Sequence, residues 1–204
     1  EYIDSVRDSL NLIELPSLIK GVRGTSNEDH TPEYLAKGVL RAAHDIYVNK
    51  DGTTRYDMTE MAITHFKPIE IGTSIEKLKT MGYEKDIYGN DLINENQILE
   101  ILPQDVILPS CKESSEEGND MVFFRCAKFI DDLLEKVYGH EKYYNLKSMK
   151  DLVGHLIISL APHTSAGIVG RIIGFSETQG CYAHPLWHSA QRRDCDGDEN
   201  GIML

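Results

Sequence analysis

Apolar residues recur at helical spacing in the middle of the chain. Phe123, Ala127, Ile130, Leu134 and Val137 follow one another at steps of three or four residues, which puts them on one face of a helix over residues 121–138. We interpret this face as part of a hydrophobic core. The preceding residues 111–120 are polar, acidic and contain glycine, so they predict a surface loop.

Shorter apolar runs predict strands before this helix. Residues 98–108 are apolar on both sides of Pro103, which favours two short buried strands. Upstream, the Asp51-Gly52 pair is a favoured tight turn between two β-prone runs, so we expect a β-hairpin near 46–57. Together with the helices, these strands predict the α+β class.

Two further helices are expected. Residues 74–81 have a capping residue, Thr73 or Ser74, at one end and Gly82 at the other. A capping-box pattern at residues 148–151 introduces the apolar residues 152–160, for which we expect a helix. We divide the chain into a mixed α/β segment (1–110), a helical segment (111–160) and a C-terminal segment (161–204).

Composition narrows the class of protein. The 204 residues include 41% hydrophobic residues and carry a formal net charge of −12, which argues against a protein that simply coats nucleic acid. No apolar run approaches the roughly 18 residues of a membrane-spanning helix, and the N-terminus has no signal pattern. The four cysteines form no CxxC motif, so we expect a cytoplasmic, reducing setting without a disulfide framework. The chain begins with Glu1 rather than Met, which we interpret as a piece of a longer chain.

Three aspartates near the C-terminus form the most distinctive chemical pattern. Asp194, Asp196 and Asp198 alternate with single residues, and Gly197 stands between the last two. In an extended segment alternate side chains project to one side, so the three carboxylates would converge. A divalent cation such as Mg²⁺, Mn²⁺ or Ca²⁺ relieves their mutual repulsion.

Two kinds of site use such a run. One is a calcium loop of the EF-hand type, whose first six positions fit residues 196–201, although the chain stops at Leu204, before the glutamate of position twelve. The other is a nucleotidyl-transfer site, where aspartates hold Mg²⁺. The aspartate run alone leaves both open.

Basic residues and histidines surround the acidic run. Pro185 and its neighbouring histidines make a poor entering helix for a calcium loop, and the mixture suits a polyanionic substrate held beside a metal. The candidate phosphate-binding or nucleic-acid-binding residues are Arg171, Arg192, Arg193, His163, His184, His188, Lys20 and Arg23. For each histidine a structural hydrogen bond is an equal alternative, and for Trp187 we favour the core over base stacking.

The order of longer motifs carries a family resemblance. The chain reads APHTSAGIVGRIIGF from Ala161, then YAHP from Tyr182, RR from Arg192 and CDGDE from Cys195. With further segments upstream, this sequence closely resembles the large, catalytic subunit of archaeal family-D DNA polymerases over essentially all of its length. An RNA polymerase-like barrel enzyme would explain the Asp-x-Asp-Gly-Asp run but not the other motifs.

The resemblance implies an architecture and an activity. The 161–204 segment would belong to a double-psi β-barrel of the two-barrel polymerase type, and the enzyme would be a DNA-directed DNA polymerase that uses two Mg²⁺ ions, with Mn²⁺ as a substitute. Asp196 and Asp198 would be the metal ligands. The family usually has asparagine in place of Asp194, so Asp194 either binds metal directly or orients a metal-bound water.

The resemblance also implies partners. These are primer–template DNA with deoxynucleoside triphosphates, the small subunit that carries a 3′–5′ exonuclease, and the sliding clamp, with no membrane. The family's barrel is expected to need strands beyond this chain and a second barrel elsewhere in the subunit. We therefore expect that the segment alone lacks a complete active site.

Overall fold

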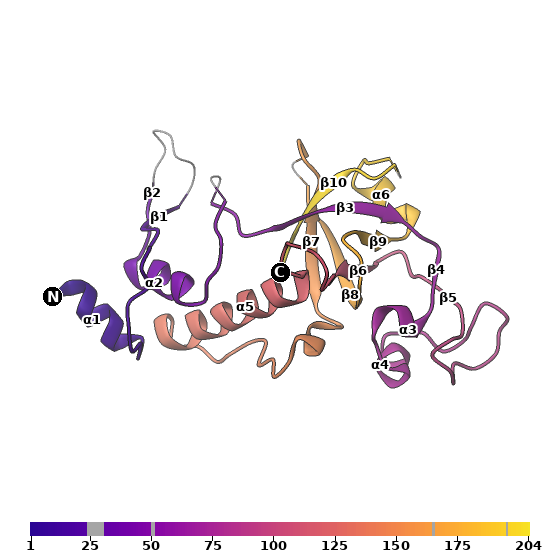
Figure 1. The fold of residues 1–204 in the computed structure, drawn as a ribbon, viewed down its shortest axis with the longest axis horizontal. Coiled ribbons are helices and arrows are strands. Elements are labelled where there is room, and N and C mark those ends of the chain that lie inside the picture. The colour runs from indigo at the N-terminus through magenta and orange to yellow at the C-terminus, as the bar shows by residue number, and fades with distance from the viewer. Residues whose placement is uncertain (24–30, 50–51, 165, 195) are drawn as a thin grey trace. The chain divides into compact units, whose positions relative to one another are not determined.

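The computed structural model describes residues 1–23, 31–49, 52–164, 166–194 and 196–204, and of Arg23 only the backbone. They form two compact units (Figure 1). Unit 1 combines Glu1–Arg55 with Val122–Lys147, and unit 2 combines Tyr56–Met121 with Ser148–Leu204. The division at residues 110 and 160 stays a prediction.

The centre of unit 2 is a closed β-barrel, so the expected barrel and α+β class are confirmed. Its strands lie in the order β10-β3-β9-β6-β8-β7, and β10 pairs with β7 to close the barrel. Two pairs are parallel, β3 with β9 and β6 with β8, and the others are antiparallel. The strands are β3 (Tyr56–Ala62), β6 (Asp105–Pro109), β7 (Leu156–Leu160), β8 (Ile168–Ser176), β9 (Cys181–Ala183) and β10 (Glu199–Met203). The expectation that closure needs strands beyond this chain is wrong.

Alternation along the strands determines what the barrel encloses. In β3 the inward positions are Met58 and Glu60, and in β7 they are Ile157 and Ser159. Side chains two residues apart on a strand share a face. The barrel therefore buries a carboxylate and a hydroxyl among its apolar side chains.

Glycines on β8 allow close packing around this barrel. A Cβ on Gly170 would overlap the ring of Trp187, and a Cβ on Gly174 would lie 2.7 Å from Cβ of Ile71. Trp187 is 2% exposed, so its predicted place in the core is confirmed. These two glycines relieve crowding between packed elements.

Short elements complete unit 2. They are β4 (His65–Phe66), α3 (Pro68–Ile71), α4 (Ile75–Thr80), β5 (Leu99–Glu100), the 3₁₀ helix η2 (Met149–Leu152) and α6 (Pro185–Ala190). The predicted helix over 74–81 is confirmed as α4. Ser74 caps it, because its side chain accepts a hydrogen bond from the backbone N–H of Lys77. The two strands expected over 98–108 are confirmed as β5 and β6.

Unit 1 is largely helical. Its elements are α1 (Tyr2–Ser9), β1 (Val22–Arg23), β2 (Thr31–Pro32), α2 (Leu35–Ala43), the greater part of α5 (Asn119–Asp132) and the π-helical turn η1 (Leu133–Val137). Val6, Leu10, Val39 and Leu40 form a buried cluster to which α5 and η1 add partly buried side chains. The helix predicted over 121–138 is confirmed as α5 followed by η1.

Two local predictions are wrong. Among the described residues of 46–57 only Tyr56 and Asp57 are strand, so the flanking strands expected for the hairpin are not formed there, and Asp51 of its expected turn lies outside the described residues. Residues 156–160 form β7 rather than a helix. Gly154 has a φ of +99°, which ends the preceding turn, and the β-branched Ile157 and Ile158 then favour a strand.

Across the described ranges, no helix is both long and apolar enough to span a bilayer.

Candidate active site

The aspartate run forms a loop between α6 and β10. Asp196 lies in a bend and Gly197 has a φ of +98°, a value that favours glycine. The extended conformation expected for this run is therefore wrong. Asp194 and Asp196 are exposed, and the Asp198 side chain is 35% exposed; Cys195 lies outside the described residues.

The backbone fixes both ends of this loop. The Arg193 N–H donates to the carbonyl of His188 at 3.0 Å, which continues the end of α6. At the other end the Glu60 N–H donates to the carbonyl of Asp198 at 2.9 Å, which ties the loop to β3. Within the loop, Nη1 of Arg193 lies 3.5 Å from Oδ2 of Asp198.

The donor chemistry of the loop suits a hard cation, because carboxylate oxygens are the ligands that Mg²⁺ and Mn²⁺ prefer. The arrangement is not a preassembled site: within the part of the chain that the structure describes, no group of three or more His, Cys, Asp or Glu side chains is placed to hold a metal ion. The expected convergence of Asp194, Asp196 and Asp198 is absent from this conformation. Their roles as metal ligands stay predictions.

Behind the loop, the barrel interior holds a carboxylate. Glu60 is 1% exposed, and its Oε1 accepts hydrogen bonds from Trp187 Nε1 at 3.1 Å, Gln191 Nε2 at 3.2 Å and Asn200 Nδ2 at 2.6 Å. Ser159 Oγ also lies within 3.4 Å of this oxygen. A buried carboxylate needs such donors to offset the loss of water.

Two of the three candidate histidines have structural positions. His188 is fully buried, with Nδ1 3.3 Å from Oε2 of Glu60, so it lies in the barrel interior and not on a surface that meets phosphate. The Nδ1 atom of His184 accepts from the N–H of Leu186 at 3.0 Å and caps α6. Pro185 is tolerated at the first position of that helix, so a short helix does precede the loop, although we expected these residues to make a poor one. His163 is exposed and has a φ of +62°.

The candidate basic residues also differ in availability. The Arg171 guanidinium donates to both carboxylate oxygens of Asp105, at 2.8 and 2.9 Å, and Asp105 is fully buried. This bidentate pair favours a structural role. Arg192 is exposed. In unit 1, Lys20 Nζ donates to the carbonyl of Asn49 at 3.2 Å, and the side chain of Arg23 lies outside the described part.

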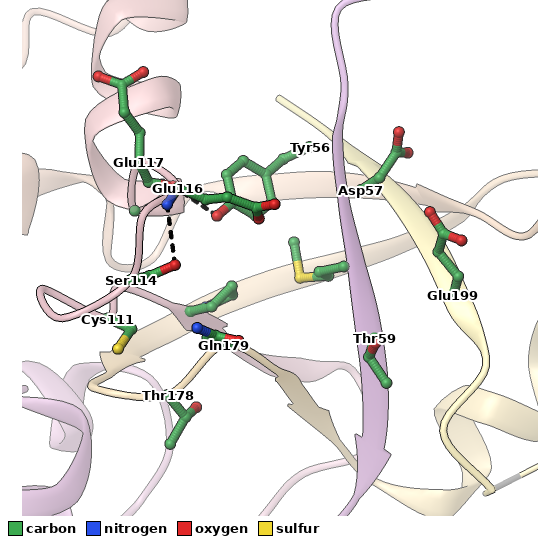
Figure 2. Close-up of a pocket in the computed structure, with 13 residues that line it drawn as sticks. Tyr56, Asp57, Thr59, Cys111, Ser114, Glu116, Glu117, Thr178, Gln179 and Glu199 are labelled. Carbon is green, nitrogen blue, oxygen red and sulfur yellow. Dashed lines mark hydrogen bonds between the residues drawn. The ribbon is translucent and has the colours of Figure 1, made fainter.

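Unit 2 also contains an acidic pocket of about 230 Å³. Figure 2 shows Asp57 and Glu199 on the neighbouring strands β3 and β10, and Glu116 and Glu117 on the segment that leads into α5. Burial raises the pKa of Tyr56 at this pocket, and the neighbouring glutamates raise it further. Four carboxylates repel phosphate, so the pocket is a poor place for a nucleotide.

The calcium-loop alternative does not fit the structure. Asn200 and Gly201, which would be positions five and six of that loop, lie in β10 and pair with Met58 and Asp57. The Asn200 amide is buried among the side chains of the barrel. It is therefore not available to a calcium ion in the loop.

Sequence reasoning missed the residues behind the loop. Glu60, Ser159 and Gln191 were not singled out, and Asn200 was noticed for its place in a possible calcium loop and as a departure from the family, which commonly has aspartate there, but not as a buried residue. The one available signal is the inward position of Glu60, two residues after the buried Met58. Its hydrogen-bond partners lie 99 to 140 residues away along the chain, so no local pattern identifies them.

Comparison with known proteins addresses the family. Residues 13–204 match the family model described as DNA polymerase II large subunit DP2, catalytic domain. The DNA polymerase II large subunit of Archaeoglobus fulgidus is 57% identical over 186 residues, which covers 91% of this chain and 16% of the relative. The corresponding subunit of Pyrococcus furiosus is 54% identical over 186 residues, covering 91% of the chain and 14% of the relative.

A third relative covers the whole chain. The DNA polymerase II large subunit of Nanoarchaeum equitans is 51% identical over 213 aligned residues, which span 100% of this chain and 17% of the relative. The chain thus spans about one sixth of the length of these relatives. Since the family model matches nearly every residue, and the motifs around the aspartate loop lie within that match, the chain belongs to the family of DNA polymerase II large subunits.

Proposed function

We propose that this chain carries the aspartate loop of a DNA-directed DNA polymerase. The observation that carries the proposal is that the match to a polymerase catalytic domain includes the loop, which is exposed at the surface of a closed barrel. In the reaction, the 3′-hydroxyl oxygen of a primer attacks the α-phosphorus of a deoxynucleoside triphosphate. The bond to pyrophosphate breaks, and the hydroxyl proton passes to solvent.

The loop carboxylates are proposed to hold the divalent cations of the reaction, Mg²⁺ or Mn²⁺. Asp196 and Asp198 are the direct ligands, and Asp194 binds directly or orients a metal-bound water. Bound cations would lower the pKa of the attacking hydroxyl and neutralise charge on the leaving pyrophosphate. Because the described residues contain no preassembled ligand set, we propose that groups elsewhere in the polymerase complete it.

Arginine next to the loop is proposed to bind the polyanionic substrates. Arg193 lies beside Asp198 and balances its charge, whereas Arg192 is exposed. A guanidinium grips phosphate through paired hydrogen bonds. Arg192 is therefore the better candidate for contact with DNA or triphosphate, and exposed His163 is a second. Lys20 and Arg23 stay candidates for contact with the DNA backbone.

Partners follow from the same proposal. The chain would act within a two-subunit polymerase whose small subunit supplies a 3′–5′ exonuclease, on primer–template DNA and with a sliding clamp, in the cytoplasm. The acidic net charge of −12 is compatible with this role, because phosphate contacts depend on local patches.

Primer extension by the reconstituted polymerase tests the proposal. We expect Asp196→Asn and Asp198→Asn each to lower kcat by about a hundredfold or more, because each removes a charged oxygen ligand. Glu199→Gln is the matched control: it removes the same charge from the next residue, which lines the acidic pocket, and should keep near-normal activity.

Three outcomes would contradict the proposal. Near-normal extension by both aspartate variants would place the metal ligands elsewhere. Equal loss in Glu199→Gln would show that the effect is general electrostatics. Preferential use of ribonucleotides would favour the RNA polymerase-like alternative.

A further inference from the structure

We propose that Glu60 is a positioning residue that holds both ends of the aspartate loop through a buried side-chain clasp. The clasp consists of Glu60, Gln191 and Asn200, with Trp187, His188 and Ser159 around it. The catalytic effect of the clasp, the correct placement of Asp196 and Asp198, rests on the proposed function. The structural effect of the clasp on the loop does not depend on the reaction.

Along the chain, the clasp contains a residue on each side of the loop. Gln191 caps the end of α6, immediately before the loop, and Asn200 is the second residue of β10, immediately after it. Asn200 Nδ2 donates to Gln191 Oε1, and both amides donate to Glu60 Oε1. One carboxylate therefore joins the residue that precedes the loop to a residue that follows it.

The side chains of the clasp are buried. Glu60, Gln191 and Asn200 are 1%, 3% and 1% exposed. Water cannot replace a hydrogen bond lost at such a site, so each lost partner leaves an unsatisfied polar group. The clasp consequently has little freedom to rearrange while the barrel stays folded.

Glu60 also holds the loop through its backbone. The N–H of Glu60 donates to the carbonyl of Asp198 at 2.9 Å, while its side chain reaches the two flanking amides. Arg193 N–H, at the other end of the loop, is bonded to the carbonyl of His188, whose ring lies against Glu60. Displacement of Glu60 would therefore move both ends of the loop together.

Glu60→Gln weakens the clasp with little change of volume. A glutamine keeps one acceptor oxygen for the surrounding donors, but it loses the negative charge, and an NH₂ group replaces the second acceptor oxygen. The two ends of the loop should then separate more often, and Asp196 and Asp198 should spend less time in the arrangement that supports catalysis.

The experiment combines hydrogen exchange with kinetics in the reconstituted polymerase. In Glu60→Gln we expect exchange of the backbone amides of residues 192–198 to rise about tenfold. We expect kcat to fall about 10- to 100-fold, as is typical when a residue that orients a metal ligand is replaced. The KM for nucleotide should change less than about twofold.

Thr73→Val is the matched control. It removes a buried hydroxyl that donates to the carbonyl of Ile173 at 2.6 Å, in the same unit but without contact to the loop. Exchange of residues 192–198 and kcat should both stay near wild type. An equal change in Thr73→Val and Glu60→Gln would overturn the proposal, because it would reflect general loosening of the barrel.

A second variant, Gln191→Met, tests the clasp in case Glu60→Gln does not fold. Gln191→Met keeps the side-chain length and the Glu60 carboxylate, but removes one amide of the clasp. We expect a smaller rise in loop exchange, about fivefold, and a parallel fall in kcat. Unchanged exchange of residues 192–198 in a folded Glu60→Gln or Gln191→Met protein would overturn the proposal.

The exchange measurement separates this inference from the proposed function. If Asp196→Asn and Asp198→Asn keep full activity, the catalytic assignment fails. Increased loop exchange in Glu60→Gln would then still support the clasp as a structural device. If the aspartate variants are inactive and loop exchange in Glu60→Gln is normal, the catalytic assignment stands and the clasp fails.

Discussion

Two buried carboxylates in the same barrel are stabilised in opposite ways. Asp105 on β6 is fully buried and held by the charged guanidinium of Arg171 and by the hydroxyl of Tyr83, which donates at 2.6 Å. Glu60 on β3 is 1% exposed and accepts hydrogen bonds from neutral indole, amide and hydroxyl groups. The two carboxylates also connect different kinds of elements.

The Asp105 pair joins two neighbouring parallel strands, since Asp105 and Arg171 are register partners on β6 and β8. A bidentate ion pair adds strength there. The Glu60 clasp instead joins a helix end to a strand start on either side of a loop. Neutral hydrogen bonds contribute less energy but depend on distance and angle, which suits the task of holding a loop in one arrangement.

Loss of Arg171 should have the largest effect on stability. Arg171→Met leaves Asp105 buried without its cation, and breaking a buried pair in this way costs about 3 to 5 kcal/mol. A urea titration followed through Trp187, the single tryptophan and a buried residue of unit 2, measures the change in the free energy of unfolding.

Arg171→Lys sharpens the interpretation. Lysine keeps the charge but not the forked geometry, so its free energy of unfolding should fall between those of wild type and Arg171→Met. If all three proteins unfold at the same urea concentration, the pair contributes nothing measurable and Arg171 becomes available again as a phosphate-binding candidate.

A methyl group at Gly170 should have an intermediate effect and reach the other carboxylate. In Gly170→Ala the new Cβ would overlap the Trp187 ring, and overpacking of this kind costs about 1 to 3 kcal/mol. Trp187 donates to Glu60, so we also expect faster hydrogen exchange in the aspartate loop. The shift in the urea midpoint and the exchange of residues 192–198 report the two effects.

Gly180→Ala is the control for this substitution. Its Cβ would meet neighbouring atoms at 3.4 Å or more, an ordinary contact, and the free energy of unfolding should change by less than about 0.5 kcal/mol. A Gly170→Ala protein as stable as Gly180→Ala would show that Trp187 moves freely, which would weaken the case for a rigid clasp.

The aspartate loop was easier to predict from the sequence than the strand β7. The aspartate loop was recognisable from its own residues. By contrast, the segment that became β7 has apolar residues at spacings compatible with a helix. In the structure, exposed Leu156 and Ile158 alternate with buried Ile157 and Ser159, which is the period of a strand.

Long-range partners explain what the sequence could not reveal. Glu60 meets Trp187 across 127 residues and Asn200 across 140, and the pairing of Asp105 with Arg171 spans 66. Such contacts depend on the order of strands in the barrel, which no local propensity specifies. The clasp could therefore be identified only from the structure of the closed barrel.

Alkaline pH should give the smallest effect and still distinguish the two regions. Burial raises the pKa of the Cys181 thiol, and the Glu60 charge raises it further; burial and the Asp105 charge likewise raise the pKa of the Tyr83 phenol. Above the ordinary values of 9.0 and 10.0 the unfolded chain loses these protons while the folded chain keeps them, so the free energy of unfolding falls as pH rises. Each group contributes at most about 1.4 kcal/mol per pH unit.

Single substitutions assign the two parts of this alkaline loss. Cys181→Ala should flatten the decline that begins near pH 9, on the Glu60 side, and Tyr83→Phe the part that begins near pH 10, on the Asp105 side. Urea titrations between pH 8 and 11, followed through Trp187, measure both slopes. If Cys181→Ala leaves the slope near pH 9 unchanged, the thiol is not held protonated beside Glu60, and the barrel interior next to the clasp is more accessible to water than the structure indicates.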